Sequence, residues 1–169
     1  MPNTLDRRTL VAMLASAGVI AITGCGQAKQ SGNSQSRSES PPKVQAAQMT
    51  VYRDPSCGCC EAWAAIARQA GYHVSLVDRP DMPAIKAKLG VPEEVASCHT
   101  ATVEGFVIEG HVPMEDVARL LKDKSEGIRG IAVPGMPRGS PGMEMPDGSK
   151  DDFQVMAFDA AGKLSAFKA

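Results

Sequence analysis

The sequence predicts one mixed α/β domain behind an N-terminal leader, and two patterns support this class. Short runs rich in β-branched residues alternate with segments whose apolar residues recur at helical spacing, and the order is strand-helix-strand followed by strand-strand-helix. Aromatic residues make up 4% of the chain, so Ala, Val, Ile and Leu must form most of the core. The net charge is -1 without a block of basic residues, which argues against a nucleic-acid partner.

Residues 1–25 have the features of an export signal. Arg7 and Arg8 give a positive start, and the apolar run over residues 10–22 is too short to span a bilayer. The run ends in Ile-Thr-Gly-Cys, which resembles a bacterial lipobox, the motif whose cysteine becomes the lipidated first residue of the mature protein. We therefore expect lipidation of Cys25 and a membrane anchor on the periplasmic side. An uncleaved apolar N-terminal helix is the alternative.

Residues 26–47 predict a flexible tether. Ser, Gln, Gly, Lys and Pro dominate this segment, and it has almost no apolar residues to bury. The folded domain is therefore expected to span residues 48–169.

The first half of the domain begins with a strand, a helix and a second strand. Residues 49–53 alternate apolar and polar side chains, and residues 73–78 form a second β-rich run. Between them, apolar residues recur at helical spacing from Trp63 to Ala70, and Gly71 ends the helix.

The chain continues with a second helix, a hairpin and a third helix. Asp81 is expected to cap a helix that ends near Leu89. Residues 101–103 and 106–108 are two short β-rich runs that suit an antiparallel hairpin. Residues 114–122 place their apolar side chains on one helical face.

The end of the chain departs from this pattern. Residues 127–150 are rich in Gly, Pro and Met and predict a long loop, which in a compact domain needs a functional reason. Residues 153–158 and 163–167 then predict a C-terminal β-hairpin. Together the elements predict a thioredoxin/glutaredoxin-like three-layer fold with a Met-rich loop and a C-terminal hairpin.

Three thiols fall at the start of the first helix, in the run Cys57-Gly58-Cys59-Cys60. The C-x-x-C pair places two sulfurs on one side of the first helical turn, where the helix dipole favours thiolate. Such a pair can hold a soft metal, catalyse disulfide exchange or form a structural disulfide. The additional Cys59 favours a metal site, because a redox pair needs only an attacking and a resolving thiol.

Cys98 and the histidines extend this cluster. In a thioredoxin-like sheet Cys98 lies before the third strand and faces the first helix, so we expect it beside the thiol loop, with a structural disulfide as the alternative. His99 is either a ligand or an exposed loop residue. His111 precedes the third helix, and this topology can return it toward the cluster as a ligand.

The methionines of the loop indicate which metal binds. Met136, Met143 and Met145 lie in a segment without an apolar face, so packing explains them less well than it explains methionines on helices. Thioether sulfur is a soft ligand that suits Cu(I) and adds little for zinc. Thiolate, imidazole and thioether together therefore predict copper, with Met136 and Met143 among the ligands and packing over the sheet as the alternative.

Several of these motifs together resemble the CopG-like family of exported copper-resistance proteins. They are Cys57-Gly58-Cys59-Cys60, Cys98-His99, Gly110-His111-Val112-Pro113, Pro134-Gly135-Met136-Pro137 and Pro141-Gly142-Met143-Glu144. The resemblance covers the whole domain and implies a thioredoxin-like fold, a periplasmic setting and copper binding. The family ligands map onto Cys57, Cys59, Cys60, Cys98, His111 and Met136. The run Thr-Ala-Thr-Val at 100–103 lacks the proline that thioredoxins place opposite their thiols, which argues against ordinary disulfide exchange.

The sequence therefore predicts a lipid-anchored copper protein of copper resistance. We expect it to hold Cu(I), with several ions bridged by thiolates, and to cycle Cu(I)/Cu(II) or hand copper to other copper-resistance proteins. A copper-dependent oxidoreductase activity is left open. A metal-free thiol-disulfide oxidoreductase and a zinc-stabilised structural module are the alternatives.

Overall fold

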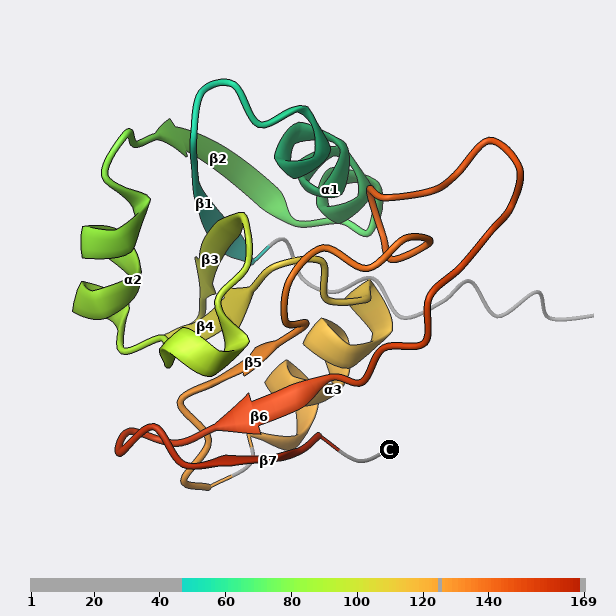
Figure 1. Ribbon diagram of the computed structural model, residues 1–169. Coiled ribbons are helices and arrows are strands. Elements are labelled where there is room, and N and C mark those ends of the chain that lie inside the picture. The colour runs from blue at the N-terminus through green and yellow to red at the C-terminus, as the bar shows by residue number, and fades with distance from the viewer. Residues whose placement is uncertain (1–46, 125, 168–169) are drawn as a thin grey trace, which may run out of the picture. The chain divides into compact units, whose positions relative to one another are not determined.

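The computed structural model describes residues 47–124 and 126–167 (Figure 1). The predicted signal peptide, the lipobox Cys25 and the tether up to residue 46 lie outside the described residues. Within the described part of the chain, no helix combines the length and the apolar character that a membrane crossing requires.

Seven strands of the described chain form one sheet in the order β2-β1-β3-β4-β5-β6-β7. β1 pairs with β2 in parallel, β3 runs antiparallel to both β1 and β4, and β5 pairs with β4 in parallel. The strands are β1 Gln48–Arg53, β2 His73–Asp78, β3 His99–Val103, β4 Phe106–Glu109, β5 Gly130–Ala132, β6 Met156–Phe158 and β7 Leu164–Ala166. The first four strands thus have the arrangement expected for a thioredoxin-like domain.

Over residues 47–124 and 126–167, three helices and one short 3-10 turn accompany the sheet: α1 Gly58–Gln69, α2 Met82–Leu89, η1 Glu93–Val95 and α3 Met114–Asp123. α2 lies on the opposite side of the sheet from α1 and α3 (Figure 1). Asp81 is at the N-cap of α2 as predicted, but its side chain makes no capping hydrogen bond. Gly90 ends α2 in the left-handed region with φ 76°, which glycine adopts without a Cβ penalty.

The core has two parts because successive strand residues point to opposite faces of the sheet. Ile108 and Ile131 belong to the larger cluster, which also contains Trp63 of α1 and Leu120 of α3. Their neighbours Val107 and Ala132 belong to a smaller cluster on the other face, against which Leu89 of α2 packs. The three-layer α/β prediction is confirmed.

The prediction of one continuous loop over residues 127–150 is wrong at its start, because Gly130–Ala132 forms β5 inside the sheet. Three residues are too few to show a period-2 alternation. Gly130 lies so close to its neighbours that a Cβ would stand 2.2 Å from the Val107 carbonyl oxygen, and such a close approach is a known reason for glycine inside a strand. The C-terminal hairpin is present and extends the sheet, although β6 and β7 are shorter than predicted.

Candidate metal centre

The loop between β1 and α1 delivers the three thiols to the first helical turn. Asp54 organises this loop, because its carboxylate accepts from the backbone N–H of Ser56 at 2.8 Å and its carbonyl accepts from the N–H of Cys57 at 3.0 Å. The hydrogen bonds from Ser56 lower the pKa of Asp54. Arg53 donates to the Cys57 carbonyl at 3.1 Å and thereby ties the loop to β1.

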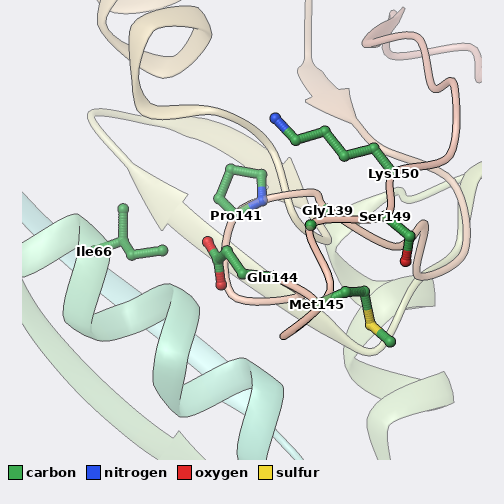
Figure 2. A pocket seen from close by; sticks show the side chains of 8 residues that line it. Ile66, Gly139, Pro141, Glu144, Met145, Ser149 and Lys150 are labelled. Carbon is green, nitrogen blue, oxygen red and sulfur yellow. The ribbon is translucent and has the colours of Figure 1, made fainter.

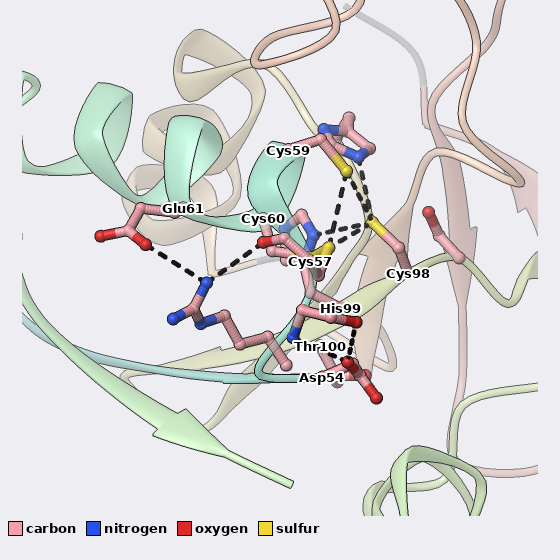
Figure 3. The surroundings of a disulfide bond; sticks show 12 residues. Asp54, Cys57, Cys59, Cys60, Glu61, Cys98, His99 and Thr100 are labelled. Carbon is pink, nitrogen blue, oxygen red and sulfur yellow. Dashed lines mark hydrogen bonds and ion pairs between the residues drawn. A yellow bond between two sulfur atoms is a disulfide. The ribbon is translucent and has the colours of Figure 1, made fainter. Parts of the chain in front are cut away.

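Four sulfurs meet at this point (Figure 3). Cys57 and Cys60 are joined as a disulfide, whereas Cys59 and Cys98 are free thiols. The Cys98 sulfur lies 3.5 Å from that of Cys60 and 3.9 Å from that of Cys59, and the Cys57 and Cys59 sulfurs are 3.5 Å apart. The expectation that Cys98 lies beside the thiol loop is confirmed, and the alternative that it forms a disulfide is wrong.

His111 reaches the same cluster from the segment between β4 and α3. Its Nε2 lies 3.1 Å from the Cys98 sulfur, and its Nδ1 lies 2.8 Å from the carbonyl oxygen of Pro141 in the Met-rich loop. A carbonyl only accepts hydrogen bonds, so Nδ1 carries the proton and the Nε2 lone pair faces Cys98. This arrangement leaves Nε2 available to a metal and fixes the orientation of the ring.

His99 is the residue that sequence reasoning left undecided between a ligand and an exposed loop residue, and the exposed alternative is wrong. It is fully buried at the start of β3, with Nδ1 3.3 Å from the Cys98 sulfur and its ring centroid 4.7 Å from that of Trp63. Its Nε2 is buried without a hydrogen-bond partner. The sequence contained a signal for this burial, because His99 alternates with Ala101 and Val103 and the three side chains therefore share one face of the strand. All three are fully or almost fully buried.

Two solved structures are similar to this chain. The first, a copper resistance protein named CopG in its form 1, is 41% identical over 72% of this chain and 95% of its own length, with a TM-score of 0.67. The chain belongs to the CopG-like family of copper-resistance proteins. The form 2 structure is 40% identical over 72% of this chain and 96% of that chain, with a TM-score of 0.68.

A family model described as a protein of unknown function, DUF411, matches residues 95–143 of this CopG-like protein. That segment contains Cys98 and His111 as well as Met136 and Met143. No curated protein matches the chain. The family assignment therefore rests on the two solved structures, with the family model covering the segment that completes the thiol cluster.

Burial keeps Cys98, His99 and His111 of this CopG-like centre neutral without a metal. Burial, and secondarily the neighbouring Cys59, raise the pKa of the Cys98 thiol to about 12. Burial lowers the pKa of His99 well below its usual value and also lowers the pKa of His111. A metal that binds Cys98 must therefore displace its proton, so metal affinity is expected to increase with pH.

The Met-rich loop packs against α1 on one side of the centre. A Cβ on Gly142, whose φ is +83°, would stand 2.8 Å from the backbone nitrogen of Trp63 and 3.0 Å from the Cys59 carbonyl oxygen. A pocket of about 490 Å³ lies next to this contact, with Ile66 of α1 on one side and Met145 on the other (Figure 2). The Met-rich loop therefore packs directly against the first turn of α1, the thiol turn, which carries Cys59 and Cys60.

The two predicted thioether ligands lie on segments that contact the backbone beside Cys98 and at Cys59. Met136 is 54% exposed and follows Gly135, whose N–H donates to the Ala96 carbonyl at 3.2 Å and whose carbonyl accepts from the Ser97 hydroxyl. Met143 is half-buried next to Gly142. Metal binding by either sulfur stays a prediction.

The donor atoms form two overlapping groups that share Cys98. One contains Cys57, Cys59, Cys60 and Cys98, and the other contains Cys98, His99 and His111, with the ligand atoms of each group within 4.8 Å of one another. The reduced set of four thiols and two imidazoles fits a soft cation. Because the thiolate is the metal ligand, Cys57 and Cys60 can serve only after their disulfide is reduced.

Proposed function

We propose that this protein is an exported copper-binding protein of copper resistance that holds Cu(I) in its Cys/His centre. The carrying observation is the convergence of four cysteine sulfurs and two histidines at one end of the sheet. Both solved relatives are named copper resistance proteins. A set dominated by thiolate sulfur favours Cu(I), and the position of Cys98 in both donor groups supports sulfur bridging between two or more ions.

Met136 is proposed to complete the centre from the solvent side. Its exposed thioether can move without disturbing the core, while the preceding Gly135 is held by hydrogen bonds to Ala96 and Ser97, next to Cys98. A neutral thioether adds a soft ligand without adding charge. Met143 is the second proposed thioether, beside the contact between Gly142 and α1.

The disulfide supports a redox role for the same centre. Reduction of the Cys57–Cys60 bond takes two electrons and two protons and yields two thiols, so the number of sulfurs free to bind copper depends on the redox state. We propose that the protein cycles copper between Cu(I) and Cu(II) or hands it to another copper-resistance protein, with electrons exchanged with an external donor or acceptor.

An anaerobic titration of the reduced protein with Cu(I) against a chromophoric chelator tests the proposal. We expect at least one tightly held copper per chain, with most of it lost in the double variant Cys57→Ser/Cys60→Ser. Met136→Leu should weaken retention more modestly, whereas Met114→Leu, at a half-buried position on α3, serves as the matched control and should not. Copper at background level in the wild type, or full retention in the double cysteine variant, would refute the function.

A metal-free thiol-disulfide oxidoreductase is the second candidate, because the Cys57–Cys60 disulfide is present. This candidate predicts exchange with dithiol substrates that is unaffected by Met136→Leu and by removal of copper. In a thioredoxin a proline would face the thiols at this place, but here the free thiol of Cys98 lies 3.5 Å from Cys60. A third thiol in this position favours metal binding over exchange with protein substrates.

The proposed location is the periplasmic side of the bacterial membrane, with the lipid on Cys25 as anchor. The lipobox-like run before Cys25 and the apolar stretch at residues 10–22 support it. Mass spectrometry of the mature chain is expected to find an acylated cysteine at its start. Cell fractionation is expected to find the wild type in the membrane fraction and Cys25→Ala outside it. An unmodified chain beginning at Met1 would refute the anchor.

A further inference from the structure

A buried ion pair joins the end of β4 to α2, the helix on the opposite side of the sheet from α1. Glu109, the last residue of β4, has no exposed side-chain surface, and its Oε1 accepts from the Lys86 ammonium of α2 at 2.5 Å. Lys86 is largely buried, with 13% of its side chain exposed. The second carboxylate oxygen accepts from the Thr100 hydroxyl at 2.6 Å.

The carboxylate also binds the backbone next to a predicted ligand. Glu109 Oε1 accepts from the backbone N–H of Ser97 at 2.6 Å, and Ser97 immediately precedes Cys98. Glu109 itself lies two residues before His111. One side chain therefore connects the segment that carries Cys98 to the segment that carries His111.

Gly110 reinforces this connection. Its N–H donates to the His99 carbonyl at 3.0 Å, and its φ is +72°. A Cβ at this position would stand 2.5 Å from the Ser97 Cβ and 2.7 Å from the Val133 carbonyl oxygen, so only glycine lets the two segments approach this closely. The distance of 3.1 Å between the Cys98 sulfur and His111 Nε2 is set within this frame.

Stability alone does not explain an ion pair at this position. Burial of two charges costs desolvation energy that their attraction only partly repays, and apolar residues of similar volume often stabilise a fold as well or better. We propose that Glu109 positions the metal centre: by binding the Ser97 N–H, its side-chain oxygen holds Cys98 against His111 before copper arrives, and Lys86 offsets the buried negative charge. This inference rests on the proposed function, because it takes Cys98 and His111 as copper ligands.

Two double variants separate the effect of the hydrogen bond on Cu(I) affinity from the effect of the charge. In Lys86→Met/Glu109→Gln both charges are removed, but the amide oxygen still accepts from Ser97 and the amide nitrogen can donate to Thr100. In Lys86→Met/Glu109→Leu the acceptor is lost as well. We expect Cu(I) affinity within about threefold of wild type in the first and about 10- to 100-fold weaker in the second, the range typical when a group that orients a metal ligand is lost.

A third variant and a remote control keep the test independent of folding failure. Glu109→Asp keeps the charge and the partner but shortens the side chain by one methylene, so it withdraws from Ser97 and should also weaken Cu(I) binding. Arg119→Met removes an ion pair with Asp116 on α3, away from the centre, and should not change affinity whatever it does to stability. Equal affinity in Glu109→Asp and wild type, or equal loss in Arg119→Met, would overturn the proposal.

Alkylation of the metal-free protein gives a readout that does not depend on copper. We expect Cys98 to react several-fold faster with iodoacetamide in Lys86→Met/Glu109→Leu and in Glu109→Asp, while Cys59 reacts at the wild-type rate and serves as an internal control. Faster Cys98 alkylation together with a wild type that binds no copper would retain the positioning role and refute the proposed function. Unchanged alkylation with unchanged Cu(I) affinity would refute the positioning role alone.

Discussion

The two halves of the metal centre are held in different ways. Cys57, Cys59 and Cys60 come from one loop and one helical turn, and Cys57 occupies the N-cap of α1 without a side-chain capping bond. Cys98 and His111 come from separate segments. Ser97, beside Cys98, donates to Glu109 on the segment that carries His111, and His111 donates to the Pro141 carbonyl of the Met-rich loop. The thiol turn is therefore a local structure, whereas the Cys98–His111 side is a tertiary one.

This difference assigns different chemistry to the halves. The thiol turn can open and close a disulfide within four residues, close to exposed neighbours such as Ser56 and Gly58. The opposite half has a fully buried His111 whose ring is oriented by Pro141. Under the proposed function, redox change therefore takes place in the first half, and the second half keeps a constant ligand geometry.

Trp63 connects the two halves of the centre, so its substitution should cause the largest loss in the free energy of unfolding. It is fully buried on α1, and its Nε1 donates to the Val112 carbonyl at 2.9 Å, one residue after His111. Trp63→Ala is expected to cost about 3–5 kcal/mol of unfolding free energy, measured by urea denaturation. Trp63→Phe keeps most of the volume but leaves the Val112 carbonyl unpaired, so a smaller cost of about 1–3 kcal/mol is expected. Equal costs for the two variants would contradict this role.

Gly142 tests the contact between the Met-rich loop and the thiol turn. Gly142→Ala forces a Cβ into the backbone of Trp63 and Cys59 and should destabilise the protein by about 2–4 kcal/mol, the sum of overpacking and positive-φ strain. Gly148→Ala is the matched control, because Gly148 has a similar φ of +73° but open space around it. The control should lose only about 1–2 kcal/mol. Equal thermal unfolding midpoints in the two variants would show that the loop does not pack against α1 as described.

The buried histidines make the stability of the metal-free protein depend on pH. Burial lowers the pKa of His99 and of His111, so below pH about 6.5 the unfolded chain binds protons that the folded chain does not. The free energy of unfolding should therefore fall as pH falls, by up to about 1.4 kcal/mol per pH unit for each histidine. His99→Phe keeps a ring against Trp63 and should reduce the slope in urea titrations between pH 7 and about pH 5. An unchanged slope would mean that His99 takes up a proton in the folded state.

The smallest effect on stability is expected from the ion pair between a residue inside the Met-rich loop and a residue just after it. Arg138 and Asp151 pair through side-chain and backbone hydrogen bonds, but Arg138 is exposed and Asp151 is only half-buried. Solvent screens such a pair, so Arg138→Gln should leave the unfolding midpoint within experimental error. A clear loss of stability would show that closure of the loop, rather than its packing through Gly142, holds it at the centre.

The sequence by itself determined the local features of this protein. Helical periodicity and β-rich runs predicted the three helices and the strands from β1 to β4, because these patterns arise from neighbours along the chain. The spacing of Cys57, Cys59 and Cys60 determined the thiol turn for the same reason. The position of Cys98 beside these thiols followed from the predicted strand order, because the third strand of such a sheet begins next to the start of the first helix.

Only the tertiary structure decided how the second half of the centre is built. The burial of His99, the carbonyl that orients His111 and the carboxylate that binds Ser97 all depend on contacts between segments distant in the sequence. β5 was not predicted from the sequence, because three residues carry no periodic signal. It forms by pairing with β4 and β6. A local pattern can encode a turn or a helix, but the environment of a buried polar group is fixed only when the sheet brings its partners together.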